Sequence, residues 1–514
     1  MIFAILFVEA ISTTACSGRG PGILEVYPPD GASGVALDDI VEVRFSEPLR
    51  GEIAANALRL FTSGKEVPAS ISLSADRRSI LLQPASLLVA STTYTAKISG
   101  RFTGDEGSSA SIERTWNFTT VEGCDIQSTT EGKISAGPDG KGGFIIPGGR
   151  RITPPGTQVD LESLPTNAIL LPRKQILVVT NNGYGIDSKK SQSLMVFDVS
   201  TPLQPRLLQT VRHPRPQALF YGLAATKEGN RVYAAGGESN VVEVYDVQAD
   251  GTLSLIDDWQ VDGFPAGLLL DETRGVLFVA AQTSGELVAL DTTTGSTIYR
   301  KKVGLLPYDM QMGPTGQKLY LSLWGRADLY QPGQVAVIDP ANGMVTKKID
   351  VGKNPEQMVL LTDGRLVVTC SDADRVDVID TTTDSLVASW PVRREGEPVG
   401  LSPVALAADE EAGRLYVACA QKNSLQVLDL SSGEMLGSIP AGWYPTAVRL
   451  SAGGEYIFLV NGKGVGSGPL TEPVNNETLM HGTLSVFEVP DERQLEAFTE
   501  QVRNNNLYPM KFFP

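Results

Sequence analysis

The sequence predicts an all-β protein with an N-terminal β-sandwich, a seven-bladed β-propeller and a short C-terminal helix. A sixteen-residue pattern of strand, small-residue turn, alternating strand and closing Asp recurs without gaps at Val232–Val247, Leu277–Thr292, Leu366–Thr381 and Leu415–Leu430. A repeat of this kind is typical of propeller blades. The 514 residues include 52 Gly and 32 Pro, which is typical of a turn-rich β protein. A chain of this length also needs more than one folding unit.

The first segment, residues 1–16, is mostly apolar and too short to span a membrane stably. It resembles a signal peptide, and Thr13-Thr14-Ala15-Cys16 followed by Ser-Gly resembles a bacterial lipoprotein cleavage site. The resemblance implies that Cys16 carries a lipid, which would tether the protein without spanning the bilayer. We therefore expect an exported lipoprotein at the outer membrane, at the cell surface or in the periplasm. An ordinary cleaved signal peptide is the alternative.

Residues 24–120 predict a β-sandwich, because short alternating runs such as Ile40–Leu49 and Arg114–Thr120 follow one another at intervals of about ten residues. The residues YPPDGASGV, FSEPL, ILLQPASLLVASTTYTAKISG and WNFTT resemble bacterial Ig-like domains. The resemblance implies a spacer or adhesion module. Residues 121–156 are rich in Gly and Pro and predict a linker, in which Asp139 belongs to a turn and not to a cation site.

Residues 157–489 contain the seven predicted blades, each of which opens on a turn and an inner strand. Their third strands close on acids at intervals of 41 to 59 residues, namely Asp198, Asp246, Asp291, Asp339, Asp380, Asp429 and Glu488. The seventh blade ends after its third strand. We expect Thr157–Glu162 to supply the missing outer strand, which closes the ring and removes its exposed edges.

The strand cores LVVTN, LYVAC and LVVTC, with third strands of the type VxVID, resemble the YVTN-repeat propellers, which include lactonase-like members. The stretches GWYPTAV, VNGKGVGSGP, HGTLSVFEVPD and VRNNNLYP resemble the propeller of a bacterial family in which a phosphoesterase domain follows. The sequence given ends at Pro514 before such a domain, so we expect no phosphoesterase activity from it. Residues 490–514 predict an amphipathic helix and a tail, with Leu495, Phe498 and Val502 on the stripe that packs against the propeller.

Composition excludes several function classes. The net charge of −16 disfavours nucleic-acid binding, which needs clustered Lys and Arg. With two histidines and no CxxCH motif, we expect no catalytic triad, metal site or other cofactor. Cys370 and Cys419 occupy the same repeat position and are expected to be buried apolar residues, whereas Cys124 in the linker is the thiol more open to reaction.

Two sets of residues predict a binding face. Blades one, four and seven are longer than the others between their second and third strands, so these insertions should emerge on one face. They carry the candidate binding residues Asn181, Asn182, Tyr184, Trp324, Arg326, Tyr330 and Lys463. Long loops on a rigid scaffold are where recognition usually resides, although drift in tolerant loops would give the same pattern.

The turns before the inner strands should open on the same face, nearer the central channel. Asp309 and Glu356, with Asn167 and Gln357, are expected to offer polar contacts there, and Trp443 and Tyr444 to stack on a planar or sugar ligand. The alternative is that these residues only hydrate the channel mouth.

These observations favour an exported, non-catalytic binding or scaffold protein that uses one propeller face to bind a protein or glycan partner, with membrane attachment only through Cys16. One alternative is a lactonase-like or hydrolytic enzyme in which Asp309 or Glu356 works with a metal. Another is a structural subunit of an extracellular assembly. Fold alone does not choose among them.

Overall fold

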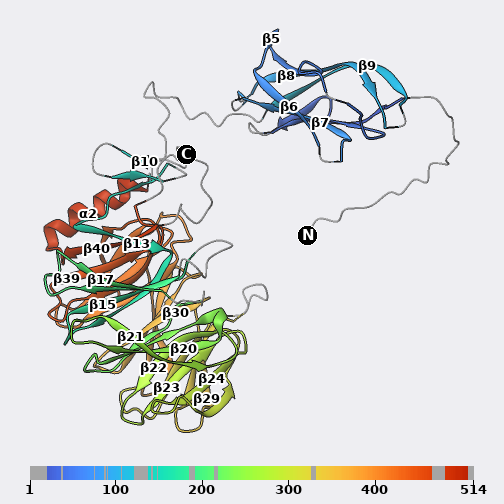
Figure 1. Ribbon diagram of the computed structural model, residues 1–514. Coiled ribbons are helices and arrows are strands. Elements are labelled where there is room, and N and C mark those ends of the chain that lie inside the picture. The colour runs from blue at the N-terminus through green and yellow to red at the C-terminus, as the bar shows by residue number, and fades with distance from the viewer. Residues whose placement is uncertain are drawn as a thin grey trace. The chain divides into compact units, whose positions relative to one another are not determined.

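The structure is a computed structural model that describes residues 20–35, 39–51, 53–74, 76–85, 88–89, 91–105, 107–120, 137–139, 143–146, 149–183, 192–212, 218–325, 332–465 and 481–506. The chain divides into two compact units, Met1–Gly132 and Lys133–Pro514 (Figure 1). Each unit has its own core and is described separately.

The first unit is a sandwich of two sheets. One sheet has the order β1-β3-β7-β6 and the other the order β2-β9-β8-β4-β5. The strands are β1 (Ile23–Tyr27), β2 (Ala32–Val35), β3 (Val41–Phe45), β4 (Leu58–Thr62), β5 (Lys65–Glu66), β6 (Ala69–Leu73), β7 (Ser79–Pro84), β8 (Thr93–Thr103) and β9 (Ser109–Thr120). Alternate residues of both sheets enter one core around Trp116, whose Nε1 donates a hydrogen bond of 3.0 Å to the Pro28 carbonyl. The predicted sandwich is confirmed.

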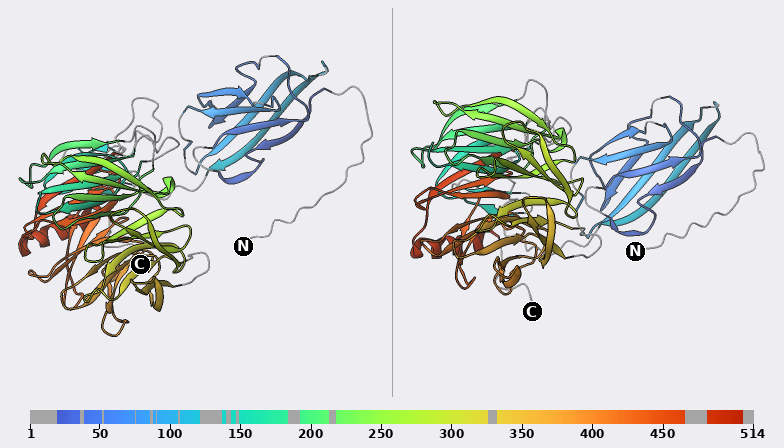
Figure 2. Two further views of the ribbon diagram at one scale, coloured as in Figure 1. Left: turned by 60° about the horizontal axis from the view of Figure 1, so that its bottom comes forward. Right: turned by 90° about the horizontal axis from the view of Figure 1, so that it is seen from below.

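The second unit is built from successive four-stranded antiparallel sheets, seven among the described residues. The first six are β14 to β17 (Pro165–Leu171, Ile176–Asn181, Ser193–Asp198, Arg206–Val211), β18 to β21 (Leu223–Ala225, Arg231–Ala235, Val241–Val247, Leu253–Gln260), β22 to β25 (Pro265–Asp271, Val276–Ala281, Glu286–Asp291, Thr297–Lys302), β26 to β29 (Pro307–Met312, Leu319–Leu323, Gly333–Asp339, Met344–Val351), β30 to β33 (Pro355–Leu360, Arg365–Cys370, Arg375–Asp380, Ser385–Pro391) and β34 to β37 (Pro403–Asp409, Arg414–Cys419, Ser424–Asp429, Met435–Pro440). A one-turn 3₁₀ helix, Gly237–Ser239, lies between β19 and β20. Two further views of these sheets are given in Figure 2.

The seventh sheet joins the two ends of the ring. Strands β38 (Pro445–Leu450), β39 (Tyr456–Asn461) and β40 (His481–Glu488) are completed by β13 (Thr157–Ser163), which pairs antiparallel with β40 from Thr157 opposite Val486 to Ser163 opposite His481 (Figure 1). The first strand of each sheet contacts the first strand of the next, and β14 contacts β38. The propeller and its closure by Thr157–Glu162 are therefore as the repeat predicts.

Small elements lie at the two ends of the second unit. Within the stretch predicted as a linker, β10 (Gly137–Pro138), β11 (Phe144–Ile145) and β12 (Arg151–Ile152) form a three-stranded sheet that the sequence analysis did not anticipate. Asp139 holds this sheet together, since its Oδ1 accepts a hydrogen bond of 2.9 Å from Gly143 N and its carboxylate pairs with Arg151. Side-chain contacts thus order a segment whose composition predicts irregular structure.

The helix α2 (Glu492–Asn505) begins at Asp491, which forms a capping box with Gln494. Leu495 and Val502 are buried, and Phe498 packs against the core of the last blades. The helix lies on β37, where Thr499 Oγ1 accepts a hydrogen bond of 2.9 Å from Ser438 N. The predicted helix and its apolar stripe are confirmed.

Cys370 and Cys419 are buried free thiols in equivalent second strands, as predicted. Cys16 and Cys124 lie outside the described residues. In the part of the chain that is described, no helix is long and apolar enough to cross a membrane.

Candidate functional site

One end of the propeller, here called the loop face, is where the inner strands begin and the second strands end. In six blades the residue before the first Pro of the inner strand has a left-handed backbone, with φ of 48° at Leu164, 64° at Phe264, 51° at Leu306, 49° at Asn354, 57° at Ser402 and 63° at Tyr444. This residue and the one before it accept hydrogen bonds from backbone N–H groups just beyond the second strand, as Leu306 does from Trp324 at 3.2 Å. The same construction therefore presents both segments on one face.

The three long loops leave from this face. Their flanking strands end at Asn181, Leu323 and Asn461, which pair with Pro165, Pro307 and Pro445 at the start of the inner strands. Of the candidate residues in these loops, Tyr184, Arg326 and Tyr330 lie outside the described residues. Asn182 is half-buried at the rim.

Asn181 differs from the other candidates because its side chain is fully buried. Its Nδ2 donates a hydrogen bond of 3.2 Å to Ser193 Oγ, between the two strands that support the long loop of blade one. Asn461 occupies the same place in blade seven and accepts a hydrogen bond of 3.0 Å from Gly442 N. Both asparagine side chains are buried and form hydrogen bonds next to the strand ends from which the long loops leave.

An aromatic cluster of Phe220, Tyr221, Phe264, Tyr308 and Trp324 lies at the channel mouth. Tyr308 stacks on Tyr221 with ring centroids 4.5 Å apart and meets Trp324 at the same separation. Phe220 packs edge-on against Phe264 at 4.9 Å and Tyr308 at 6.4 Å. Aromatic pairs in these geometries hold one another in place, so the cluster is a rigid apolar platform.

Trp443, Tyr444 and Lys463 form a second group on the loop face. Lys463 N donates a hydrogen bond of 3.0 Å to the Trp443 carbonyl, which fixes the two segments side by side. The Lys463 Nζ then lies 5.1 Å from the Trp443 ring centre and 4.9 Å from that of Tyr444, within the range of cation–π attraction. Partial burial lowers the pKa of Lys463. The structure thus brings together three residues that the sequence singled out separately.

Side chains at the third position of the inner strands connect neighbouring blades. Asn167 Nδ2 donates to the Tyr221 carbonyl at 2.8 Å, Asp309 Oδ2 accepts from Met358 N at 2.9 Å, and Gln357 Oε1 accepts from Leu406 N at 2.9 Å. Each inner strand concerned has a register irregularity next to this position. These three side chains consequently form hydrogen bonds to backbone groups that the strand pairing leaves without a partner.

Two glycines occupy the same third position where no side chain fits. A Cβ on Gly222 would lie 2.2 Å from the Ala266 carbonyl oxygen, and one on Gly267 would lie 1.9 Å from that of Tyr308. Glycine at these positions lets the inner strands of blades two, three and four approach one another closely. Blades two and three therefore contribute no polar side chain to the channel at the third position of their inner strands.

The two candidate acids lie at the channel mouth, where Asp309 is buried and Glu356 is half-buried. Burial raises the pKa of Asp309 to about 7, and the backbone N–H groups of Met358 and Met310 partly oppose the shift. Burial also raises the pKa of Glu356 to about 8, against a hydrogen bond from Ser371. Charged forms are disfavoured because the surrounding aromatic rings exclude water. Both groups therefore exchange protons near neutral pH.

Arg449, on β38, is the basic side chain of the channel. Its Nη2 donates a hydrogen bond of 2.8 Å to Asn167 Oδ1, and its Nη1 donates one of 2.6 Å to the Val448 carbonyl. Burial lowers the pKa of its guanidinium, opposed by the nearby Tyr221 and Asp309. Arg449 and Asp309 influence each other across the channel without forming an ion pair.

A cavity of about 250 Å³ runs along the inner strands below these groups. Its polar wall is made by Asn167, Asp309, Gln311, Gln357 and Arg449. Its apolar wall is made by residues of β14, β18 and β22, among them Ile169 and Leu269. One polar and one apolar wall are typical of a small-molecule site.

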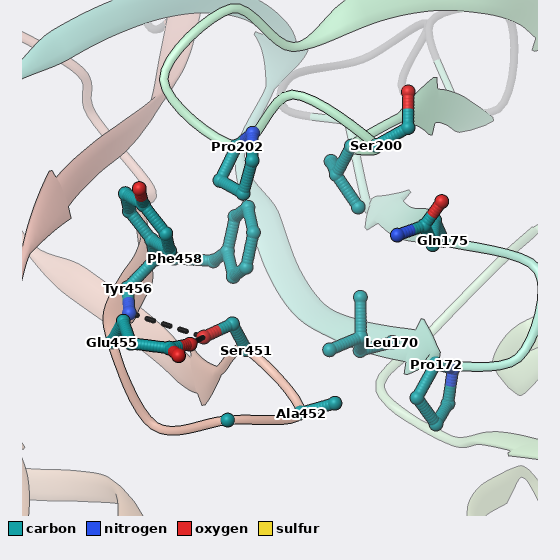
Figure 3. Close-up of a pocket in the computed structure, with 12 residues that line it drawn as sticks. Leu170, Pro172, Gln175, Ser200, Pro202, Ser451, Ala452, Glu455, Tyr456 and Phe458 are labelled. Atoms are coloured by element: carbon teal, nitrogen blue, oxygen red, sulfur yellow. Dashed lines mark hydrogen bonds between the residues drawn. The ribbon is translucent and has the colours of Figure 1, made fainter.

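A second cavity, of about 200 Å³, lies on the opposite face between blades seven and one. It is bordered by the turns around Pro172, Pro202 and Ser451, with Phe458 at its base (Figure 3). The side chains around it are mainly apolar and small. Within the described residues, no three His, Cys, Asp or Glu side chains are grouped so as to hold a metal ion.

Arg449 and most of the aromatic cluster were not predicted from the sequence. Arg449 follows an ordinary alternating strand, YPTAVRL, and nothing local marks its side chain as directed into the channel. Tyr221 and Tyr308 hold the second position of their inner strands, next to the third-position polar residues. Aligning the seven inner strands position by position is the signal that could have found them.

The fold and the site thus define a propeller protein that carries an Ig-like domain. Residues 18–120 match the family model of the bacterial Ig-like domain, and domains of this kind are typical of extracellular or surface proteins. No curated protein sequence matches the chain.

Solved structures of propeller-type proteins resemble the second unit. Hydrazine synthase of Kuenenia stuttgartiensis aligns with a TM-score of 0.51 and 18% identity over 65% of this chain and 97% of that chain. Virginiamycin B lyase from Staphylococcus aureus aligns with a TM-score of 0.48 and 13% identity over 64% of this chain and 98% of that chain. Identities this low show the fold and not the activity.

Proposed function

We propose that the protein is an exported binding protein that recognises a protein or glycan partner with the loop face of its propeller. The observation that carries the proposal is the convergence of Trp443, Tyr444 and Lys463 with the aromatic cluster around one channel mouth. The long loops of blades one, four and seven begin at the same face. Aromatic and basic side chains on a rigid scaffold are the residues most often found at recognition hot spots.

The proposal extends to the location of the protein. The bacterial Ig-like domain at residues 18–120 supports a surface or extracellular setting. We infer that the domain acts as a spacer and that a lipid on Cys16 tethers the chain to the outer membrane, from the surface or the periplasmic side. We also infer, from the strand cores quoted above, that the propeller is of the YVTN-repeat type and related to those that precede a phosphoesterase domain.

Binding would be tested with purified protein on a glycan array and against solubilised envelope proteins. Trp443→Ala combined with Lys463→Ala should remove most of the binding, because both contribute to one platform. Met344→Ala is the matched control, since this exposed side chain lies on the outer strand β29, away from the loop face. Equal binding by the native protein and the double variant would overturn the proposal.

A second candidate function is catalysis at the channel mouth. The observation that favours it is the pKa of about 7 for Asp309 and about 8 for Glu356, values suited to general acid–base chemistry. A panel of lactones and phosphoesters, with and without added divalent metals, would test it. Turnover that Asp309→Asn or Glu356→Gln abolishes would favour the enzyme, and a protein inactive on the whole panel would exclude it for these substrates.

A further inference from the structure

We propose that the channel cavity is a binding site for a small carboxylate, held by the guanidinium of Arg449 inside the propeller. The inference does not depend on the function proposed for the loop face. It concerns the cavity of about 250 Å³ among the inner strands, which has no part in the platform of Trp443, Tyr444 and Lys463.

The guanidinium of Arg449 has N–H groups that form no hydrogen bond to the described residues. A guanidinium has five N–H donors, and the described residues accept two, at Asn167 Oδ1 and the Val448 carbonyl. Asn167 Oδ1 has both of its acceptor sites in use, since it also accepts a hydrogen bond from Ala168 N. The donors that remain on Arg449 face a cavity that this residue lines.

The positive charge of Arg449 also favours an anionic ligand. Arg449 is half-buried in the channel, and withdrawing a cation from water is costly unless an anion is paired with it. Among the described residues, Asp309 is the acid whose charge acts on Arg449, and the two form no ion pair. Tyr221, Tyr308 and Arg449 face Asp309, and burial raises its pKa to about 7, so about half of its carboxyl groups are uncharged at neutral pH and most are uncharged below it. A ligand carboxylate would supply the missing negative charge.

The shape and lining of the cavity also suit a carboxylate ligand. A planar carboxylate matches the fork of a guanidinium, which favours two parallel hydrogen bonds. Gln357 has its Oε1 engaged by Leu406 N, which leaves its NH₂ group for the ligand, and Gln311 donates to the Met358 carbonyl, which leaves its Oε1. The opposite wall contains Ile169, Leu268 and Leu269.

Such a lining fits a short carbon chain that carries one carboxylate and a further polar group. The volume corresponds to roughly eight water molecules at about 30 Å³ each, which limits the site to a small molecule or to one terminal unit of a larger one. The chemistry is shared by a free hydroxy acid and by an acidic sugar residue.

The test is isothermal titration of the full chain in buffer without carboxylates, using propionate, lactate and glucuronate. Propionamide and inorganic phosphate serve as uncharged and non-planar comparisons. We expect saturable one-to-one binding of at least one carboxylate and none of propionamide. Lactate alone would identify a free hydroxy acid as the source, and glucuronate alone an acidic sugar. Absence of binding by all three carboxylates, or equal binding of propionamide, would overturn the proposal.

Two variants connect the binding to the cavity. Arg449→Lys keeps the charge but loses the fork and one charge-assisted hydrogen bond, so affinity should fall by about tenfold or more. Ala225→Leu enlarges a side chain of the cavity lining on β18 and leaves Arg449 itself unchanged, so it should abolish binding even if the Arg449 variant does not fold. Arg300→Lys is the matched control, because Arg300 pairs with Glu286 outside the cavity. Unchanged affinity in both channel variants would overturn the assignment.

Discussion

The acids at the two faces of the propeller have opposite environments. On the opposite face, the closing acids of four blades accept hydrogen bonds from backbone N–H groups two or three residues later, and these bonds lower the pKa of Asp198, Asp291, Asp380 and Asp429. At the channel mouth, burial raises the pKa of Asp309 and Glu356. The first group is stabilised as carboxylates, whereas the second resists ionisation.

The difference in pKa distinguishes the acids that maintain the fold from the acids of the candidate site. A closing Asp recurs because its short carboxylate accepts hydrogen bonds in the turn to the outer strand, as it does in blades one, three, four, five and six. Asp309 and Glu356 do not recur. In the other blades, the third position that Asp309 holds is Asn167, Gly222, Gly267, Gln357, Ala405 or Ala447, and the second position that Glu356 holds is Thr166, Tyr221, Ala266, Tyr308, Val404 or Thr446, so the repeat does not require a carboxylate at either place. Acids that break the repeat are therefore the ones to examine for function.

The sharpest test of this contrast is the pH dependence of Asp309→Asn. The pKa of Asp309 is raised from 3.8 to about 7 in the native state. Its stabilising contribution is therefore complete below about pH 4 and is lost as the pH rises to about 7, on the order of 4 kcal/mol in total. Asp309→Asn cannot ionise at this position, so it does not lose this stability as the pH rises. Urea unfolding in carboxylate-free buffer should show Asp309→Asn gaining stability relative to the native protein as the pH rises from about 4 to about 7, with little further change above that.

Gly267→Ala tests how closely the channel end of the ring is packed. The added Cβ would lie 1.9 Å from the Tyr308 carbonyl oxygen, so we expect a loss of about 3 kcal/mol in the free energy of unfolding. Gly275→Asn is the control in the same blade, in a turn of the opposite face where φ is 65°. Asn tolerates this backbone, so the cost should be about 1 kcal/mol or less. Similar losses of unfolding free energy in the two variants would show that the channel end is not more closely packed than the opposite face.

Asp198→Ala addresses a closing acid. Asp198 accepts hydrogen bonds of 2.9 Å from Ser200 N and from Arg206 Nη2, and these hold its pKa at about 2. We expect a loss of about 1 kcal/mol at pH 7, which disappears as the pH falls from about 4 to 2 because the native carboxylate then becomes protonated. Asp198→Asn, which keeps the turn acceptor, should lose less. Thermal unfolding across this pH range is the measurement.

Lys463→Met should have the smallest effect on stability. The ammonium group lies over the rings of Trp443 and Tyr444 at a partly exposed site, where cation–π attraction contributes about 0.5 to 1 kcal/mol. We expect a change of that size in urea unfolding, with a larger effect on partner binding. A loss of several kcal/mol would show that Lys463 is part of the scaffold and not of a binding platform.

The fold was predictable from the sequence because its information is periodic. Alternating strands such as those of Val232–Val247 bury one face in the same way in each blade, so the pattern identifies the blade, and its missing seventh outer strand identifies β13. The small sheet of β10, β11 and β12 was not predictable. It depends on the contact of Asp139 with Gly143 and Arg151, and composition says nothing about such contacts.

The sequence by itself determined the sandwich, the seven blades, the closure by β13, the C-terminal helix and the face from which the long loops emerge, because each follows from local alternation or from spacing along the chain. Only the tertiary structure decided that Arg449 meets Asn167 across the junction of the first and last blades, and that Lys463 lies over Trp443 and Tyr444. It also decided that Asp309 is buried, which raises its pKa, while Asp198 is not. Burial depends on residues far apart in the chain, which become neighbours only when the blades pack around the ring, whereas the contact of Lys463 with Trp443 and Tyr444 needs the folding of blade seven.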